Sequence, residues 1–109
     1  MERRLGQRAR TDFPVKTRDG QLKSNCRGIE ISASGIVLER GRQVRGGDSM
    51  LLDLELSSPE RAAPIRALAR SVWSFGTQQA LKFIRISDAD RLSLAEHIDL
   101  AQLRGALTT

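Results

Sequence analysis

Most of this chain alternates apolar and polar residues, and the pattern changes only once, near residue 87. The clearest stretch is residues 50–56 (Met-Leu-Leu-Asp-Leu-Glu-Leu), where every second residue is Met or Leu. A period of two predicts a β-strand with one buried face. After Ser87, apolar residues recur at three- and four-residue spacing, which predicts a helix. The sequence therefore favours a β-fold that carries one helix at its C-terminal end.

Six stretches have the composition of strands. They cover residues 13–18, 21–33, 36–39, 50–56, 65–73 and 80–84. Asp19-Gly20 between the first two is a strong hairpin signal, and Gly28 within the second predicts a bulge or tight bend. Six such strands followed by a helix predict a mainly β protein, a small six-stranded antiparallel β-barrel with the helix packed on it.

Both ends of the expected helix carry sequence signals. Ser87 and Asp90 have the spacing of a capping box, in which Ser87 would be the N-cap. Gly105 is expected to end the helix. The chain then divides into a flexible, arginine-rich segment at residues 1–12 and a folded domain at residues 13–104.

Positive charge is concentrated at the start of the chain. Residues 1–10 hold four arginines and one glutamate, which is +3 of the net charge of +5. A guanidinium is planar, permanently charged and matches phosphate with a fork of donors. The segment has no apolar period with which to bury itself. It therefore predicts a mobile anion-binding segment, with a solvated tail as the alternative.

Several other residues limit the function classes. A lone cysteine, Cys26, cannot form an internal disulfide, and no stretch resembles a signal peptide or membrane span, so we expect a cytoplasmic protein without a membrane partner. Cys26 itself reads as a small strand residue. His97 has no ligand-type neighbour at suitable spacing and is expected on the helix surface. Because the sequence shows no nucleophile–base pair and no metal cluster, it predicts neither an enzyme nor a bound cofactor.

The remaining candidates for a nucleic-acid surface are weak. Arg40, Arg42 and Arg45 are expected in a solvated loop, although they could support such a surface. Trp73 is expected to contribute barrel packing rather than a base-stacking platform. With three Phe, one Trp and no Tyr, the chain has few residues for the stacking that single-stranded nucleic acid requires.

Two short motifs resemble the signature of PilZ domains. One is an Arg-x-x-x-Arg pair, formed here by Arg4 and Arg8, and Arg3 sits where the family often has an extra arginine. The other is an Asp/Asn-x-Ser-x-x-Gly turn, which residues 30–35 match as Glu-Ile-Ser-Ala-Ser-Gly. Glu30 replaces the usual Asp or Asn. In this order and strand context, the two motifs together resemble the family closely.

Further positions extend this resemblance over residues 2–100. They are Phe13-Pro14-Val15, Val72-Trp73 and Asp90-Arg91-Leu92. The resemblance implies a six-stranded split barrel with a C-terminal helix. It also implies a receptor for the bacterial second messenger cyclic di-GMP that passes its signal to a protein effector.

Roles for individual residues follow from the same resemblance. Arg4 and Arg8, together with Arg3, would bind phosphates and the O6 and N7 atoms of guanine. Ser32 would donate its hydroxyl, and Glu30 would accept from a guanine N–H. Gly35 would permit a positive φ and a close backbone approach. The arginine segment would fold over the barrel when the ligand binds.

Three function classes stay open at this point. The first is a cyclic di-GMP receptor, and the second is a PilZ-like adaptor that binds no nucleotide and acts by protein contacts. The change to Glu30 keeps the second alive. The third, a nucleic-acid-binding barrel, is supported by charge and opposed by the low aromatic content.

Overall fold

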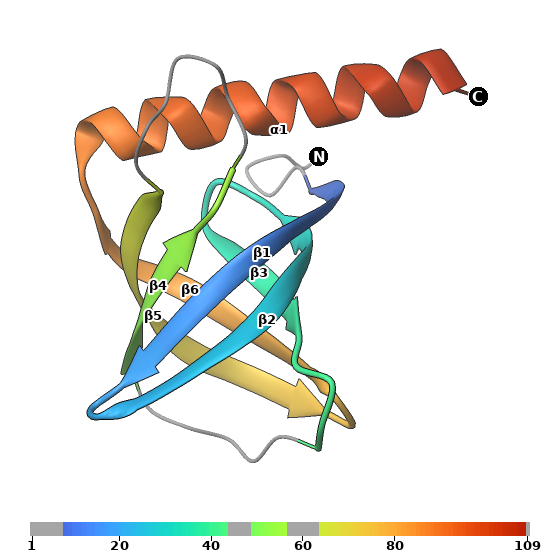
Figure 1. Ribbon diagram of the computed structural model, residues 1–109. Helices are drawn as coiled ribbons and strands as arrows, with labels where there is room; N and C mark the ends of the chain where they lie inside the picture. Colours follow the sequence, from blue (N-terminus) through green and yellow to red (C-terminus); the bar gives the residue numbers. More distant parts are fainter. Residues whose placement is uncertain (1–7, 44–48, 57–63, 109) are drawn as a thin grey trace.

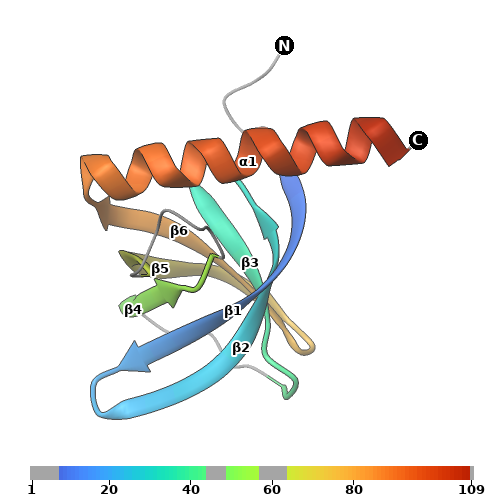
Figure 2. The same cartoon turned by 45° about the horizontal axis from the view of Figure 1, so that its top comes forward.

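The computed structural model describes residues 8–43, 49–56 and 64–108, with side chains placed up to residue 104. Within them, six strands close into an antiparallel barrel, and one helix lies across an end of it (Figures 1 and 2). The elements are β1 (Ala9–Asp19), β2 (Leu22–Ile31), β3 (Gly35–Glu39), β4 (Ser49–Leu54), β5 (Ile65–Phe75), β6 (Gln78–Ile86) and α1 (Asp88–Thr108). Their order around the barrel is β1-β2-β3-β6-β5-β4. The predicted six-stranded antiparallel barrel with a C-terminal helix is confirmed.

Alternation along each strand fills the barrel interior. In β4, Met50, Leu52 and Leu54 are buried, as the period of two predicted. Cys26 is also buried in β2, where its Sγ donates to the Val15 carbonyl oxygen. The barrel is thus built around one apolar core, and its outer face carries the polar residues.

Two bulges change which residues face outward. The register between β2 and β3 shifts between Gly28 and Glu30, which confirms the predicted irregularity at Gly28. Gly28 and Ile31 are buried while Glu30 is half-buried, so the shift turns Glu30 away from the core. A second shift, between Ser71 and Trp73 in β5, leaves Trp73 46% exposed. Glu30 and Trp73 both face outward and line the same pocket.

Strand β1 begins four residues earlier than the sequence predicted. Ala9 is buried and pairs with Ile31, and Arg10 pairs with Glu30. The ladder with β2 continues past Phe13 through an irregularity, which the alternation pattern could not show. Residues 9–12 therefore belong to the barrel, and residues 1–7 of the expected flexible segment lie outside the described part.

The start of α1 follows the capping signal. The Asp90 N–H donates to Ser87 Oγ (3.1 Å), which confirms Ser87 as N-cap. The Asp90 carboxylate accepts from the backbone N–H of Arg66 in β5 (3.2 Å) and so ties the helix to the barrel. Leu94 and Ile98 are buried against the barrel end. No helix among the described residues has both the length and the apolar character needed to span a membrane.

The far end of α1 and its histidine differ from expectation. The helix continues through Gly105 to Thr108, so the predicted stop at Gly105 is wrong. A glycine within a helix lowers the stability of the helix by only about 1 kcal/mol relative to alanine, and neighbouring residues with high helix propensity can offset this loss. His97 is half-buried rather than on the surface: its Nε2 is 2.9 Å from Thr11 Oγ1, and its ring meets Phe13 edge-on. The early start of β1 supplies Thr11, whereas Phe13 lies at the start of the predicted strand.

A polar network occupies the barrel end opposite α1. Arg40 was expected in solvent, but it is half-buried and donates to Gln79 Oε1 (2.9 Å) and Ser24 Oγ (3.0 Å). Gln79 is 1% exposed and donates in turn to Ser71 Oγ. Arg42 is exposed as expected, and Arg45 lies outside the described residues. Arg40 is therefore a structural residue of the barrel.

Candidate ligand-binding site

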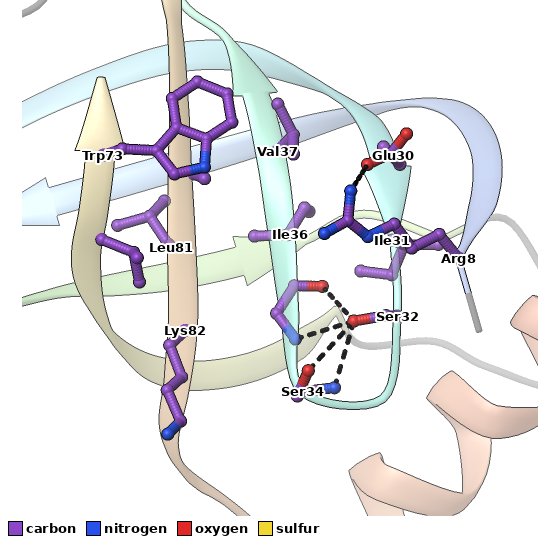
Figure 3. A pocket seen from close by; sticks show the side chains of 13 residues that line it. Arg8, Glu30, Ile31, Ser32, Ser34, Ile36, Val37, Trp73, Leu81 and Lys82 are labelled. Carbon is purple, nitrogen blue, oxygen red and sulfur yellow. Dashed lines mark hydrogen bonds and ion pairs between the residues drawn. The ribbon is translucent and has the colours of Figure 1, made fainter. Parts of the chain in front are cut away.

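An open pocket of about 260 Å³ lies on the outer face of the barrel, beside the turn that joins β2 to β3 (Figure 3). Four of the six predicted site residues line it: Arg8, Glu30, Ser32 and Gly35. Arg3 and Arg4 lie outside the described residues. The structure thus brings the second arginine of the Arg-x-x-x-Arg pair together with the Glu-x-Ser-x-x-Gly turn.

Strand pairing builds the floor of this pocket. Glu30 pairs with Val37, Val37 with Ala80, and Ala80 with Trp73, so these residues form one row across four strands. The row runs from a carboxylate at β2 to an indole at β5, over two small apolar side chains. A flat apolar floor with an aromatic edge suits a planar base, while the polar groups gather at the β2 side.

Ser32 organises the turn itself. Its Oγ accepts from the N–H groups of Gly35 (3.2 Å) and Ser34 (3.3 Å), and its own N–H donates to the Gly35 carbonyl oxygen (2.9 Å). Such bonds are typical of serine-stabilised turns. Ser32 lines the pocket but is only 8% exposed, so little of its surface is open to solvent. Its donation to a ligand stays a prediction.

Gly35 is required for close approach and not for an unusual φ. The positive φ values among the described residues belong to Gly20, Gly41 and Gly76, so the expected positive φ at Gly35 is wrong. Gly35 is already extended as the first residue of β3, where it pairs with Lys82. A Cβ at this position would lie 2.3 Å from the Leu81 carbonyl oxygen. The glycine thus allows β3 to approach β6 closely, and its expected role toward a ligand stays a prediction.

Arg8 and Glu30 form an ion pair across the mouth of the pocket. Arg8 Nη1 lies 3.2 Å from Glu30 Oε1, and the two side chains are 71% and 35% exposed. An exposed pair of this kind contributes about 0–1 kcal/mol, so it opens at little cost. The Arg8 carbonyl oxygen also accepts from Gln102 Nε2 of α1 (3.4 Å). The arginine is therefore held at its backbone while its guanidinium stays available.

Among the pocket residues that were not assigned to the site from the sequence, Trp73 and Lys82 offer functional side chains. Trp73 lines the pocket instead of filling the core, because the bulge in β5 turns it outward. Lys82 projects from β6 at the pocket edge. Alternation with buried Leu81 and Phe83 placed Lys82 on the outer face, but only strand order shows that it neighbours the turn. Among the described residues, no three His, Cys, Asp or Glu side chains gather as a metal site.

Comparison with known proteins supports the same fold. The Bacillus subtilis inhibitor of motility, MotI/DgrA, is similar with a TM-score of 0.81 and 21% identity, over 95% of this chain and 53% of that chain. The chain thus spans about half the length of that protein. The PilZ domain of CeSA from a cellulose-synthesizing bacterium is similar with a TM-score of 0.63 and 11% identity, over 84% of this chain and 94% of that one. No curated protein matches the sequence. Because residues 2–100 match the PilZ domain family, this chain belongs to that family.

Proposed function

We propose that this PilZ domain is a receptor for cyclic di-GMP and that the pocket beside the β2–β3 turn is its binding site. The observation that carries the proposal is the meeting of Arg8 with Glu30, Ser32 and Gly35 around one pocket. These residues belong to two motifs far apart in the sequence. A shared pocket gives both of them one ligand to act on.

Each wall offers a contact that suits part of a cyclic dinucleotide. The Arg8 guanidinium can bind a phosphate, or O6 and N7 of a guanine, through charge-assisted hydrogen bonds. Glu30 can accept from a guanine N–H once it is free of Arg8. Trp73 presents a half-exposed aromatic face on which a base can stack. Arg3 and Arg4 precede Arg8 closely and would supply further phosphate contacts.

Binding requires the Arg8–Glu30 ion pair to open. The pair is exposed, so the loss is small beside the charge-assisted bonds that replace it. We expect the residues before β1, with Arg8, to fold over the ligand and to present a changed surface to a protein effector. The similar Bacillus subtilis protein is named an inhibitor of motility, and by analogy this domain would act on a partner in the cytoplasm. Amide hydrogen exchange of residues 2–8 should slow when cyclic di-GMP is added, and equal exchange would contradict this folding.

A second candidate is an adaptor that binds no nucleotide. It is favoured by the same ion pair, because Glu30 occupies Arg8 in the absence of ligand. The Ser32 hydroxyl is likewise engaged within its own turn. In this case the pocket would be a remnant, and the domain would act by protein contacts alone.

Calorimetric titration separates these functions. Cyclic di-GMP, GMP and a random single-stranded oligonucleotide should each be added to the full chain. The proposal expects saturable binding of cyclic di-GMP, weaker binding of GMP and none of the oligonucleotide at the same concentration. No heat with cyclic di-GMP would favour the adaptor, and binding of the oligonucleotide alone would favour a nucleic-acid barrel.

A further inference from the structure

Two basic residues stand directly opposite each other beside the pocket, outside both motifs. Lys82 of β6 pairs with Arg70 of β5 on one side and with Gly35 of β3 on the other. Both basic side chains are exposed, and within the described residues neither forms an ion pair. Like charges directly opposite each other on neighbouring strands destabilise a sheet. An anion bound between them would relieve that repulsion.

The position of Lys82 gives the pocket a second cationic edge. Lys82 and Arg8 both line the pocket, and Figure 3 shows them on opposite sides of β3. Glu30, which holds Arg8, lies on β2, so β2 and β6 are separated by two strand spacings, or roughly 10 Å. The apolar row through Val37 and Ala80 lies between the two edges. Two cationic edges on either side of an apolar floor suit a ligand with two anionic groups.

We propose that Lys82, assisted by Arg70, is a second anion contact and that the pocket selects a ligand with two phosphodiesters. One phosphodiester meets Arg8, and the other meets Lys82. This inference rests on the proposed function and names the residues that distinguish a cyclic dinucleotide from a mononucleotide.

The two edges differ in how they are held. Leu81 and Phe83, on either side of Lys82, are buried in the core and fix β6 in place. Arg8 precedes β1 and is tied to the rest by an exposed ion pair and one backbone contact. The Lys82 edge is therefore preorganised, which limits the entropy lost on binding.

Neutral substitutions with a matched control test the inference. Lys82→Gln removes a charge at the pocket edge, and Arg70→Gln removes the charge paired with it on β5. Arg85→Gln removes a charge from the same sheet outside the pocket. Calorimetry with cyclic di-GMP should show about tenfold weaker binding for Lys82→Gln and a few-fold loss for Arg70→Gln. Arg85→Gln should bind like wild type. GMP binding should change much less in every variant, because one phosphate uses only one edge.

Thermal unfolding without ligand provides a second readout. Lys82→Gln should match wild type or melt slightly higher, since it removes a like-charge pair. If wild type binds cyclic di-GMP, and Lys82→Gln and Arg70→Gln bind it as well as Arg85→Gln does, the proposal of a second anion contact is wrong and the proposed function stands. If wild type binds no cyclic di-GMP, the proposed function and this inference both fail.

Discussion

Arg8 and Arg40 are the same residue type in two different settings. Arg40 is half-buried at one end of the barrel, where Gln79 and Ser24 accept its hydrogen bonds. Arg8 lies beside the pocket, is 71% exposed and has one carboxylate partner, Glu30. Arg40 thus has fixed neutral partners that cannot be exchanged for a ligand. Among the described residues, Arg8 has one ion-pair partner, Glu30, and a ligand can replace this exposed partner.

This contrast distinguishes an arginine that stabilises the fold from one whose donors stay open to a ligand. A guanidinium whose bonds satisfy buried groups stabilises the fold, and its removal leaves those groups unpaired. An exposed guanidinium in a weak ion pair adds little stability but keeps donors for an anion. The same distinction applies within the pocket, where Gly35 allows β3 and β6 to pack closely and Arg8 is the residue proposed to bind the ligand. Substitutions can test each side of this comparison.

The largest effect is expected at Gly35, a motif residue on the supporting side. In Gly35→Ala the new methyl would lie 2.3 Å from the Leu81 carbonyl oxygen, so β3 and β6 must move apart. Overpacking against backbone should cost about 3 kcal/mol of unfolding free energy. Urea unfolding measures it, with Ser34→Ala as a control in the same turn. Unchanged stability would mean that the glycine serves the ligand directly.

Arg40→Ala should come next. It leaves the Gln79 amide oxygen, on a side chain only 1% exposed, without its arginine donor. The loss should be about 2 kcal/mol, which lowers Tm by roughly 10 °C in a domain of this size. Cyclic di-GMP affinity should stay unchanged below the new Tm. Arg42→Ala, on an exposed neighbour, should leave Tm where it was.

Arg8→Ala should weaken ligand binding and leave stability nearly unchanged, which is the reverse of Arg40→Ala. Losing an exposed ion pair should move Tm by no more than a few degrees. Cyclic di-GMP binding should weaken at least about tenfold, because charge-assisted bonds contribute about 1.5–3 kcal/mol each. Arg4→Ala is expected to behave in the same way. Wild-type affinity for both variants, measured by calorimetry, would remove the arginines from the site.

Glu30→Asp should have a smaller effect of opposite sign. The Glu30 side chain is long enough to lie 3.2 Å from Arg8 Nη1, and an aspartate would be shorter by one methylene. Shortening should release the guanidinium and restore the carboxylate position typical of the family. We expect cyclic di-GMP to bind a few-fold more tightly, an effect of about 1 kcal/mol. Side-by-side titration decides it, and an aspartate variant that binds no better would show that the ion pair does not compete with the ligand.

The smallest effect concerns His97, on the supporting side. Burial, and to a lesser degree the charge of Arg104, lowers the pKa of His97 below its ordinary value of 6.5. A lowered pKa means that the unfolded chain takes up the proton more readily. The contribution of His97 to stability is therefore complete above pH 6.5 and declines as pH falls below it. Urea midpoints of wild type and His97→Gln between pH 7.5 and 5 should show a steeper decline for wild type, and parallel curves would refute the assignment.

Sequence periodicity was sufficient for the strands, their antiparallel barrel and the start of the helix. Alternation is a local property, and so are the turn at Gly20 and the cap at Ser87. The motif pattern also identified Arg8 and the turn residues that line the pocket. Boundaries were less predictable: β1 begins earlier and α1 ends later than expected, because pairing and helical hydrogen bonds continue past local signals.

Only the tertiary structure decided which outward residues meet. The bulge in β5 reverses the direction of Trp73, and β5 has no glycine to mark the bulge as Gly28 does in β2. The order β2-β3-β6-β5 then places Trp73 and Lys82 beside the Glu30 turn, although they lie more than 40 residues away in the sequence. The partners of Arg40 come from β2 and β6 in the same way. Sequence fixes the inward or outward tendency of a residue, but its neighbours depend on strand order and register, which are set by the closed barrel as a whole.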